Sequence, residues 1–100
     1  MTRSIVSNSR RCLICGATEP LHKHHVFTSA NRPISEREGC WVYLCSRHHN
    51  GSNEGVHFDA RFDRMLKMYT QARWMWINGR TVADFRKVFG KSYIDEEDFL

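Results

Sequence analysis

The chain lacks any long apolar run. No stretch approaches the roughly 20 apolar residues of a membrane-spanning helix, although 41% of the residues are hydrophobic. The first eight residues, MTRSIVSN, lack the apolar segment of a signal peptide. Internal repeats and low-complexity segments are missing as well. We therefore expect a cytoplasmic protein that does not associate with a membrane.

A strong excess of either charge is also lacking. Fifteen Lys and Arg against eleven Asp and Glu give a net charge of +4, which suits a phosphate backbone but equally an ordinary solvated surface. Residues 95–98 hold four of the acids, so the remainder is more basic than the total suggests. We expect residues 1–100 to form a single domain, and a structural metal would supplement the small core of so short a chain.

The first half of the chain predicts a ribbon of two strands. Residues 1–11 are mostly polar and are expected to be a frayed lead-in. Residues 21–27 and 40–44 have the side-chain patterns that are typical of strands. We expect these two segments to pair antiparallel. The polar segment 28–39 is expected to be a loop, and a helix should begin within 45–49. The predicted fold class is α+β.

The second half predicts two helices. From residue 59 onward, apolar side chains recur every three or four positions, as on one side of a helix. That stripe comprises Phe62, Met65, Leu66, Tyr69, Arg73 and Trp76. We expect Trp76 to lie in the core and Trp74, off the stripe, to lie at the surface. A shorter helix over 82–89 should begin after Thr81 as its N-cap.

The cysteine spacing predicts a structural metal site. Cys12 and Cys15 are separated by two residues, and so are Cys45 and His48. Such half-sites place two donors on adjacent corners of a tetrahedron, which is typical of structural Zn²⁺. Free buried cysteines or a redox pair are the alternatives. Cys40 could replace His48 as the fourth ligand, although we favour a role for Cys40 in packing alone.

Two pairs of adjacent histidines are the most informative feature. His24 and His25 lie in a predicted strand, where neighbouring side chains face opposite ways. His48 and His49 lie in a predicted helix, where neighbours point about 100° apart. Each pair must therefore be divided between two roles. With His48 assigned to zinc, His49 faces another site.

These motifs resemble a known family. Cys-x-x-Cys, a His-His pair followed by an apolar residue, and a strand ending in Leu-Cys-x-x-His-His-Asn resemble the HNH nucleases of the ββα-metal fold. The segments that resemble small HNH proteins of phages and prophages, a group similar to the phage recombination-enhancement nucleases, are residues 30–32, 44–53, 55–57 and 89–91. The likeness covers most of residues 12–93.

The resemblance implies a zinc-stapled ββα-metal domain with a helical C-terminal extension. Its parts would be a zinc-bound HNH core (12–58), C-terminal helices (59–93) and an acidic tail (94–100). The implied function is metal-dependent hydrolysis of phosphodiester bonds in double- or single-stranded DNA, within phage or prophage DNA processing or recombination. The bacterial host cytoplasm would be its location, and a recombination or phage-assembly protein could be a partner.

The resemblance also implies roles for individual residues. His24 and His49 match the ligands of the catalytic divalent metal, and His25 matches the general base. Asn53 falls where related sites place a further histidine or asparagine, and His57 would bind the metal or the scissile phosphate. Two imidazole ligands suit Mn²⁺, Ni²⁺ or Zn²⁺ better than Mg²⁺, which prefers oxygen, so the physiological ion stays open among these four.

Two other functions stay open. The family's middle asparagine, which orients the base, has no clear counterpart in this sequence, and its absence favours a non-catalytic zinc-ribbon module that binds nucleic acid or protein. A phage accessory protein acting within a larger assembly is the other alternative. Basic side chains that could contact phosphates are Arg61, Arg64, Lys67, Arg73, Arg80, Arg86, Lys87 and Lys91.

Overall fold

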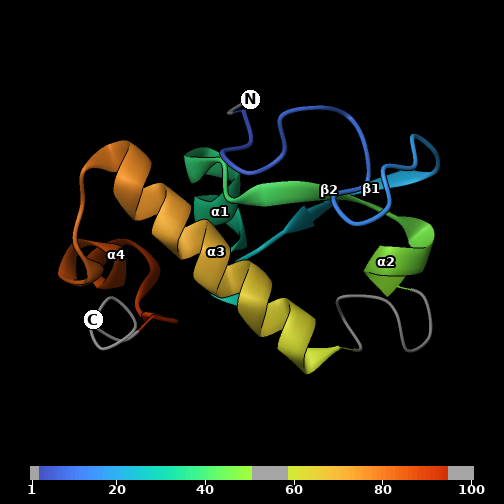
Figure 1. The fold of residues 1–100 in the computed structure, drawn as a ribbon. Coiled ribbons are helices and arrows are strands. Elements are labelled where there is room, and N and C mark those ends of the chain that lie inside the picture. Colours follow the sequence, from blue (N-terminus) through green and yellow to red (C-terminus); the bar gives the residue numbers. More distant parts are fainter. Residues whose placement is uncertain (1–2, 51–58, 95–100) are drawn as a thin grey trace.

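The computed structural model describes residues 3–50 and 59–94 (Figure 1). Asn53, His57 and the acidic residues 95–98 lie outside this part of the chain. The elements, in order, are β1 (Leu21–His25), η1 (Ser29–Asn31), α1 (Arg32–Glu38), β2 (Trp41–Cys45), α2 (Ser46–Asn50), α3 (Ala60–Asn78) and α4 (Val82–Phe89). The small α+β class predicted from the sequence is confirmed at this level.

The two strands form an antiparallel ribbon, as predicted. Leu21 pairs with Cys45 at one end, and His25 pairs with Trp41 at the other. β2 is followed at once by α2, so the helix that carries the second histidine pair begins where the strand ends. In Figure 1, α2 lies at one end of the ribbon and α4 toward the opposite end, with α3 running between them.

The prediction of a loop over 28–39 is wrong, because α1 occupies most of this segment. Pro33 lies in its first turn, and Gly39 ends it in the left-handed conformation with φ 75°. Its middle is fixed to the end of the first strand by Ser35, which is fully buried. The Ser35 hydroxyl donates to the carbonyl of Phe27 at 2.7 Å and accepts from the Phe27 N–H at 3.1 Å. α1 is therefore held against the ribbon.

The N-terminal segment is not frayed within its described part. The Ile5 N–H donates to the carbonyl of Gly39 at 2.9 Å, and the Ser4 hydroxyl donates to the carbonyl of Trp41. Ile5 also packs against the core. A side chain at Gly39 would collide with the carbonyl of Arg3, so the close approach of the two segments requires glycine there.

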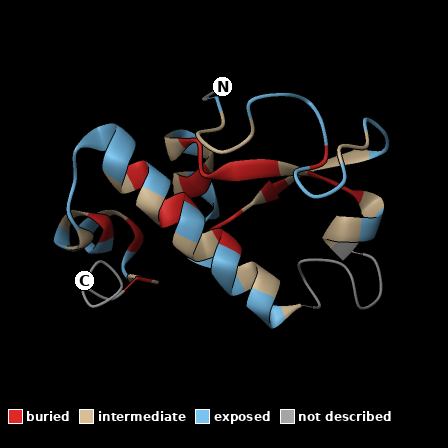
Figure 2. Ribbon diagram, in the orientation of Figure 1, coloured by how far each residue is buried: buried red, intermediate tan, exposed pale blue. Residues whose placement is uncertain are grey.

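The long helix α3 faces the core with a different side from the one predicted. Trp74 is 3% exposed and Trp76 is 77% exposed, the reverse of the prediction. The buried residues of α3 are Leu66, Thr70, Gln71 and Trp74. Two of these are polar, which disguises the inward side in the sequence. Figure 2 shows buried and exposed residues alternating along α3, as expected for a helix lying over the ribbon.

An aromatic cluster joins the ribbon to the C-terminal helices. The Phe27 ring lies 5.3 Å from that of Phe85 and 4.8 Å from that of Phe89, measured between centroids. Trp74 adds a contact of 5.5 Å with Phe85. Edge-on and offset aromatic pairs at such distances are favourable beyond their buried area. None of the helices in residues 3–50 and 59–94 has the length and apolar character required to cross a membrane.

Candidate metal centre and histidine pocket

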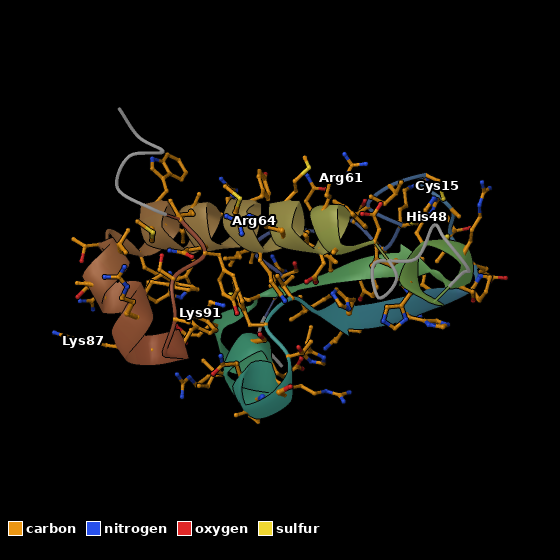
Figure 3. The ribbon with its side chains drawn as sticks, turned by 90° about the horizontal axis from the view of Figure 1, so that it is seen from below. Cys15, His48, Arg61, Arg64, Lys87 and Lys91 are labelled. Atoms are coloured by element: carbon orange, nitrogen blue, oxygen red, sulfur yellow. The ribbon has the colours of Figure 1, made fainter. Side chains whose placement is uncertain are left out.

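Four predicted zinc ligands converge at the end of the ribbon next to α2. All the donor atoms of Cys12, Cys15, Cys45 and His48 lie within 4.8 Å of one another. The Sγ of Cys15 lies 3.7 Å from that of Cys45, and the Nδ1 of His48 lies 3.3 Å from the Cys45 Sγ and 3.6 Å from the Cys12 Sγ. In Figure 3, Cys15 and His48 lie together beside α2. These four side chains can hold a metal ion.

The N-terminal half of this cluster is a tight turn attached to β2. The Gly16 N–H donates to the carbonyl of Cys12 at 2.9 Å, and the Leu13 N–H donates to the carbonyl of Tyr43 at 2.9 Å. Gly16 adopts a positive φ of 75°, which glycine permits without strain. The turn therefore presents two thiols to the strand end that carries Cys45.

The environment of Cys12 favours the thiolate that metals require. Burial raises the pKa of Cys12, but hydrogen bonds from the backbone of Cys45, Cys15 and Ile14 outweigh it and lower that pKa to about 6. The backbone hydrogen bond from Ala17 lowers the pKa of Cys15, yet burial and the neighbouring thiols raise it above its ordinary value. The neighbouring thiols thus disfavour a second thiolate in the cluster, and a bound cation would relieve the repulsion between thiolates.

Cys40 is not part of the cluster. It is fully buried in the core, and burial together with the charge of Glu38 raises the pKa of its thiol to about 12. A thiol held in the neutral form packs as a small apolar side chain. This location supports the interpretation that Cys40 packs in the core, over the alternative that it binds the metal.

The two histidines of α2 face different groups, as predicted. His48 faces the cysteines, whereas the Nδ1 of His49 lies 2.8 Å from the Nδ1 of His22 on β1. The Nε2 of His22 lies 3.3 Å from the Ser46 hydroxyl. His49 is thus held on one side by a strand histidine.

His24 and His49 lie close together beside a shared cavity. Their ring centroids are 5.3 Å apart with the ring planes at 64°, and His24 is 3% exposed. A cavity of about 210 Å³ lies against both rings and opens between β1, η1 and α2. Its lining residues are Lys23, His24, His25, Thr28, Ser29, Arg32 and His49. Three of the predicted catalytic residues therefore line one cavity.

His25 has a partner that the sequence did not reveal. Its Nε2 lies 2.8 Å from an Oε2 of Glu36 on α1, and the same carboxylate accepts from the Lys23 ammonium at 2.9 Å. The pKa of Glu36 is lowered, first by Lys23 and then by His25. In the sequence, the one indication that Glu36 lies on a helix is the pattern of its segment, which has a proline at its start and a glycine after its end.

The remaining predicted site residues are not placed. Asn53 and His57 lie outside the described residues. Within residues 3–50 and 59–94, the Cys3His cluster is the one group of three or more His, Cys, Asp or Glu side chains whose donor atoms converge for a metal. His24 and His49 lie at a cavity that His25 also lines, but these side chains do not form a second converging group within that range.

Comparisons with known proteins return no match. No family model, curated protein or solved structure is significantly similar to this chain.

Proposed function

We propose that the protein is a metal-dependent endonuclease that hydrolyses phosphodiester bonds in DNA and is held together by a structural zinc. The observation that carries the proposal is the division of the histidine pairs. His48 joins the cysteines, while its neighbour His49 meets His24 and His25 at one cavity. Packing alone gives no reason for three imidazoles from two elements to line a polar hollow.

Zinc fits the Cys3His cluster. A tetrahedral ion with Zn–S near 2.3 Å and Zn–N near 2.0 Å separates its donors by about 3.5 to 3.8 Å. Three of the distances between donor atoms, 3.3, 3.6 and 3.7 Å, are close to those values, and all four donor atoms lie within 4.8 Å of one another. The donor set, three sulfurs and one imidazole, is among those that zinc prefers.

Glu36 supports the role of His25 as general base. A carboxylate accepts hydrogen bonds and donates none, so the Nε2 of His25 must carry the proton in their 2.8 Å contact. That tautomer leaves Nδ1 of His25 as the nitrogen that takes a proton from the attacking water. Glu36 would orient the imidazole, the task of the asparagine that has no counterpart in this sequence.

The cavity also suits a phosphate and a cation. Arg32 lines it with positive charge, as does Lys23, whose ammonium is paired with the Glu36 carboxylate. Positive charge attracts the backbone of a nucleic acid. A divalent cation bound by His24 and His49 would stabilise the negative charge that builds on the phosphate during hydrolysis. Two imidazole ligands favour Mn²⁺, Ni²⁺ or Zn²⁺ over Mg²⁺.

The test is nicking of supercoiled plasmid by zinc-loaded protein, with no further metal or with Mg²⁺, Mn²⁺, Ni²⁺ or additional Zn²⁺. We expect nicked or linear product with at least one ion. His25→Ala should reduce the rate at least about 100-fold, because general bases contribute about 10²- to 10⁴-fold. The zinc content of the variant and its unfolding temperature should stay unchanged.

Arg37→Ala is the control, since Arg37 is exposed on α1 and pairs with Glu38 rather than lining the cavity. It should nick like the wild type. Equal nicking by His25→Ala would refute the role given to His25. Zinc-loaded wild type that nicks with none of the ions would favour the non-catalytic zinc-binding module.

A further inference from the structure

α3 turns a row of large apolar side chains toward solvent. Met65, Tyr69 and Trp76 are all exposed, and Trp76 is the most exposed of them at 77%. With Ala72 between them, their spacing of four, three and four residues places them on one side of the helix. Burying such side chains would be favourable, so this row contributes nothing to the stability of the domain by itself.

Arginines flank this row, and acids do not. Arg61 and Arg73 lie beside it in the helical pattern, and Arg80, just after the helix, lines a hollow next to Trp76. The one acid of α3, Asp63, pairs with Lys67 at 2.8 Å. In Figure 3, Arg61 and Arg64 lie along α3, and Lys87 and Lys91 lie toward the α4 end of the molecule. We define the outer face of α3 as Arg61, Met65, Tyr69, Ala72, Arg73, Trp76 and Arg80.

The surroundings of Trp76 resemble a stacking platform. The guanidinium of Arg73 lies 5.6 Å from the centre of its ring and is anchored by a hydrogen bond of 3.1 Å from its Nε to the carbonyl of Ile5. A hollow of about 350 Å³ opens beside the ring. Its lining residues are Ala72, Met75, Trp76, Gly79 and Arg80. An aromatic ring, an apolar floor and a cation are thus grouped at one point.

We infer that the outer face of α3 binds single-stranded nucleic acid, with unpaired bases stacking on Trp76 and Tyr69 and arginines contacting phosphates. Base stacking on exposed aromatic side chains beside basic residues is the usual mode of sequence-independent single-strand binding. A duplex would not satisfy these rings, because its bases cover one another's faces. A second copy of this chain would bring arginine against arginine. The inference stands apart from cleavage at the histidine pocket.

The test is binding of a labelled oligothymidylate of about 12 nucleotides to the zinc-loaded full chain without added divalent ions. Trp41 and Trp74 are 6% and 3% exposed, so stacking should quench the fluorescence of Trp76 above all. Trp76→Ala should weaken binding roughly tenfold, the effect of losing one base–aromatic stack. Trp76→Phe should keep most of the affinity and lose the quenching.

Charge is tested in the same assay by salt dependence. Arg80→Ala should reduce the slope of log affinity against log salt by about 0.7, as expected for one lost phosphate contact on a single strand. Two controls should behave like the wild type: Arg37→Ala, which removes a charge from α1, and Ile77→Ala, which removes an exposed apolar side chain next to Trp76.

Several results would overturn the inference. One is equal affinity for a duplex of the same length, and another is Trp76→Ala binding the oligonucleotide as tightly as the wild type. No binding at all, with an acidic protein partner binding instead, would assign the face to protein. A wild-type dimer that Trp76→Ala converts to a monomer would assign it to self-association. Each result is independent of whether the plasmid is nicked.

Discussion

At the scale of single residues, the backbone under each histidine pair decides what each imidazole meets. His24 and His25 alternate across β1, so His24 is buried near His49 while His25 reaches Glu36. His48 and His49 diverge around α2 in the same manner. The four side chains thereby meet four different groups. His48 meets the cysteine cluster and His49 meets His22, whereas His25 meets the α1 carboxylate and His24 the ring of His49.

Replacement of Glu36 should separate the orientation of the His25 imidazole from the binding of DNA. Glu36→Gln removes the acceptor charge that fixes the Nε2–H tautomer of His25. We expect the kcat for plasmid nicking to fall about 100-fold, the order of loss that misplacement of a catalytic group causes. The KM for DNA should not rise, since the substitution removes a negative charge beside Lys23 and His25.

Glu19→Gln is the matched control, because Glu19 is exposed and lies outside the cavity. It should leave both constants unchanged. A Glu36→Gln enzyme with the wild-type kcat would show that His25 needs no carboxylate partner, while the separate role of His25 would still be tested by its own alanine variant.

The sequence predicted the histidine division but not its partner. Spacing alone separates His24 from His25 and His48 from His49, because strand and helix geometry are fixed by the backbone. Glu36 is different. Its contact with His25 depends on where α1 lies against the ribbon, which is set by the buried Ser35 and its bonds to Phe27, and these are tertiary contacts.

At the scale of elements, α4 begins with the N-cap that its sequence predicts. The Thr81 hydroxyl accepts from the Asp84 N–H at 3.2 Å, and the Asp84 carboxylate accepts from the Thr81 N–H at 2.9 Å. This capping box satisfies two backbone donors that the first turn leaves open. The helix it starts carries Phe85 and Phe89 into the aromatic cluster.

Thr81→Ala should therefore lower the free energy of unfolding by about 1 kcal/mol, or roughly 4 to 8 °C in unfolding temperature for a domain of this size. Thr28→Ala should cost less, because Thr28 precedes η1 without a side-chain cap hydrogen bond. Thermal unfolding followed by circular dichroism compares the two. Equal losses would mean that the cap of α4 contributes nothing specific.

The same cap predicts a pH dependence. Hydrogen bonds from the Thr81 backbone and hydroxyl lower the pKa of Asp84 below its ordinary value of 3.8. A lowered pKa in the folded state means that the carboxylate stabilises the fold above pH 3.8 and loses this effect as the pH falls through the folded-state pKa. The stability difference between the wild type and Asp84→Ala should thus shrink in acid. A difference that stays constant down to pH 2 would contradict this assignment.

Helix ends proved more predictable than helix faces. The cap at Thr81 follows from local chemistry, and it occurs where the sequence places it. The inward side of α3 did not follow, because two polar residues, Thr70 and Gln71, are buried there, and Gln71 is held by specific hydrogen bonds. Gln71 donates to the Ser92 hydroxyl at 2.8 Å and accepts from the Tyr93 N–H at 2.7 Å. A polar residue satisfied in this way breaks the apolar pattern.

At the scale of the whole molecule, the ribbon is secured at both ends by different means. A two-stranded ribbon is marginally stable alone. One end packs through Phe27 against α3 and α4, and the other end carries Cys45 and the start of α2 into the cysteine cluster. Only the second attachment includes side chains that can hold a metal ion. That attachment also fixes His49, which follows His48 directly, so metal binding and the histidine pocket are coupled through α2.

Loss of the metal should therefore both destabilise the domain and disable the pocket. Cys12→Ser should lower the bound metal from one ion per chain toward none, as measured by elemental analysis. A metal present at about 1,000 times its Kd stabilises by about 4 kcal/mol, so the unfolding temperature should fall by roughly 16 to 32 °C. Titrating the wild type with a chelator provides the same comparison if the variant does not fold.

Cys40→Ala is the matched control for a lost thiol. Cys40 is buried in the core away from the cluster, so this variant should keep one metal ion per chain and lose only packing energy. If Cys12→Ser retained its metal, or if Cys40→Ala lost it, the four ligands would be wrong. If Cys12→Ser instead lost its metal yet still nicked DNA at the wild-type rate, α2 would hold His49 in place without the metal, and the coupling between the two sites would be refuted.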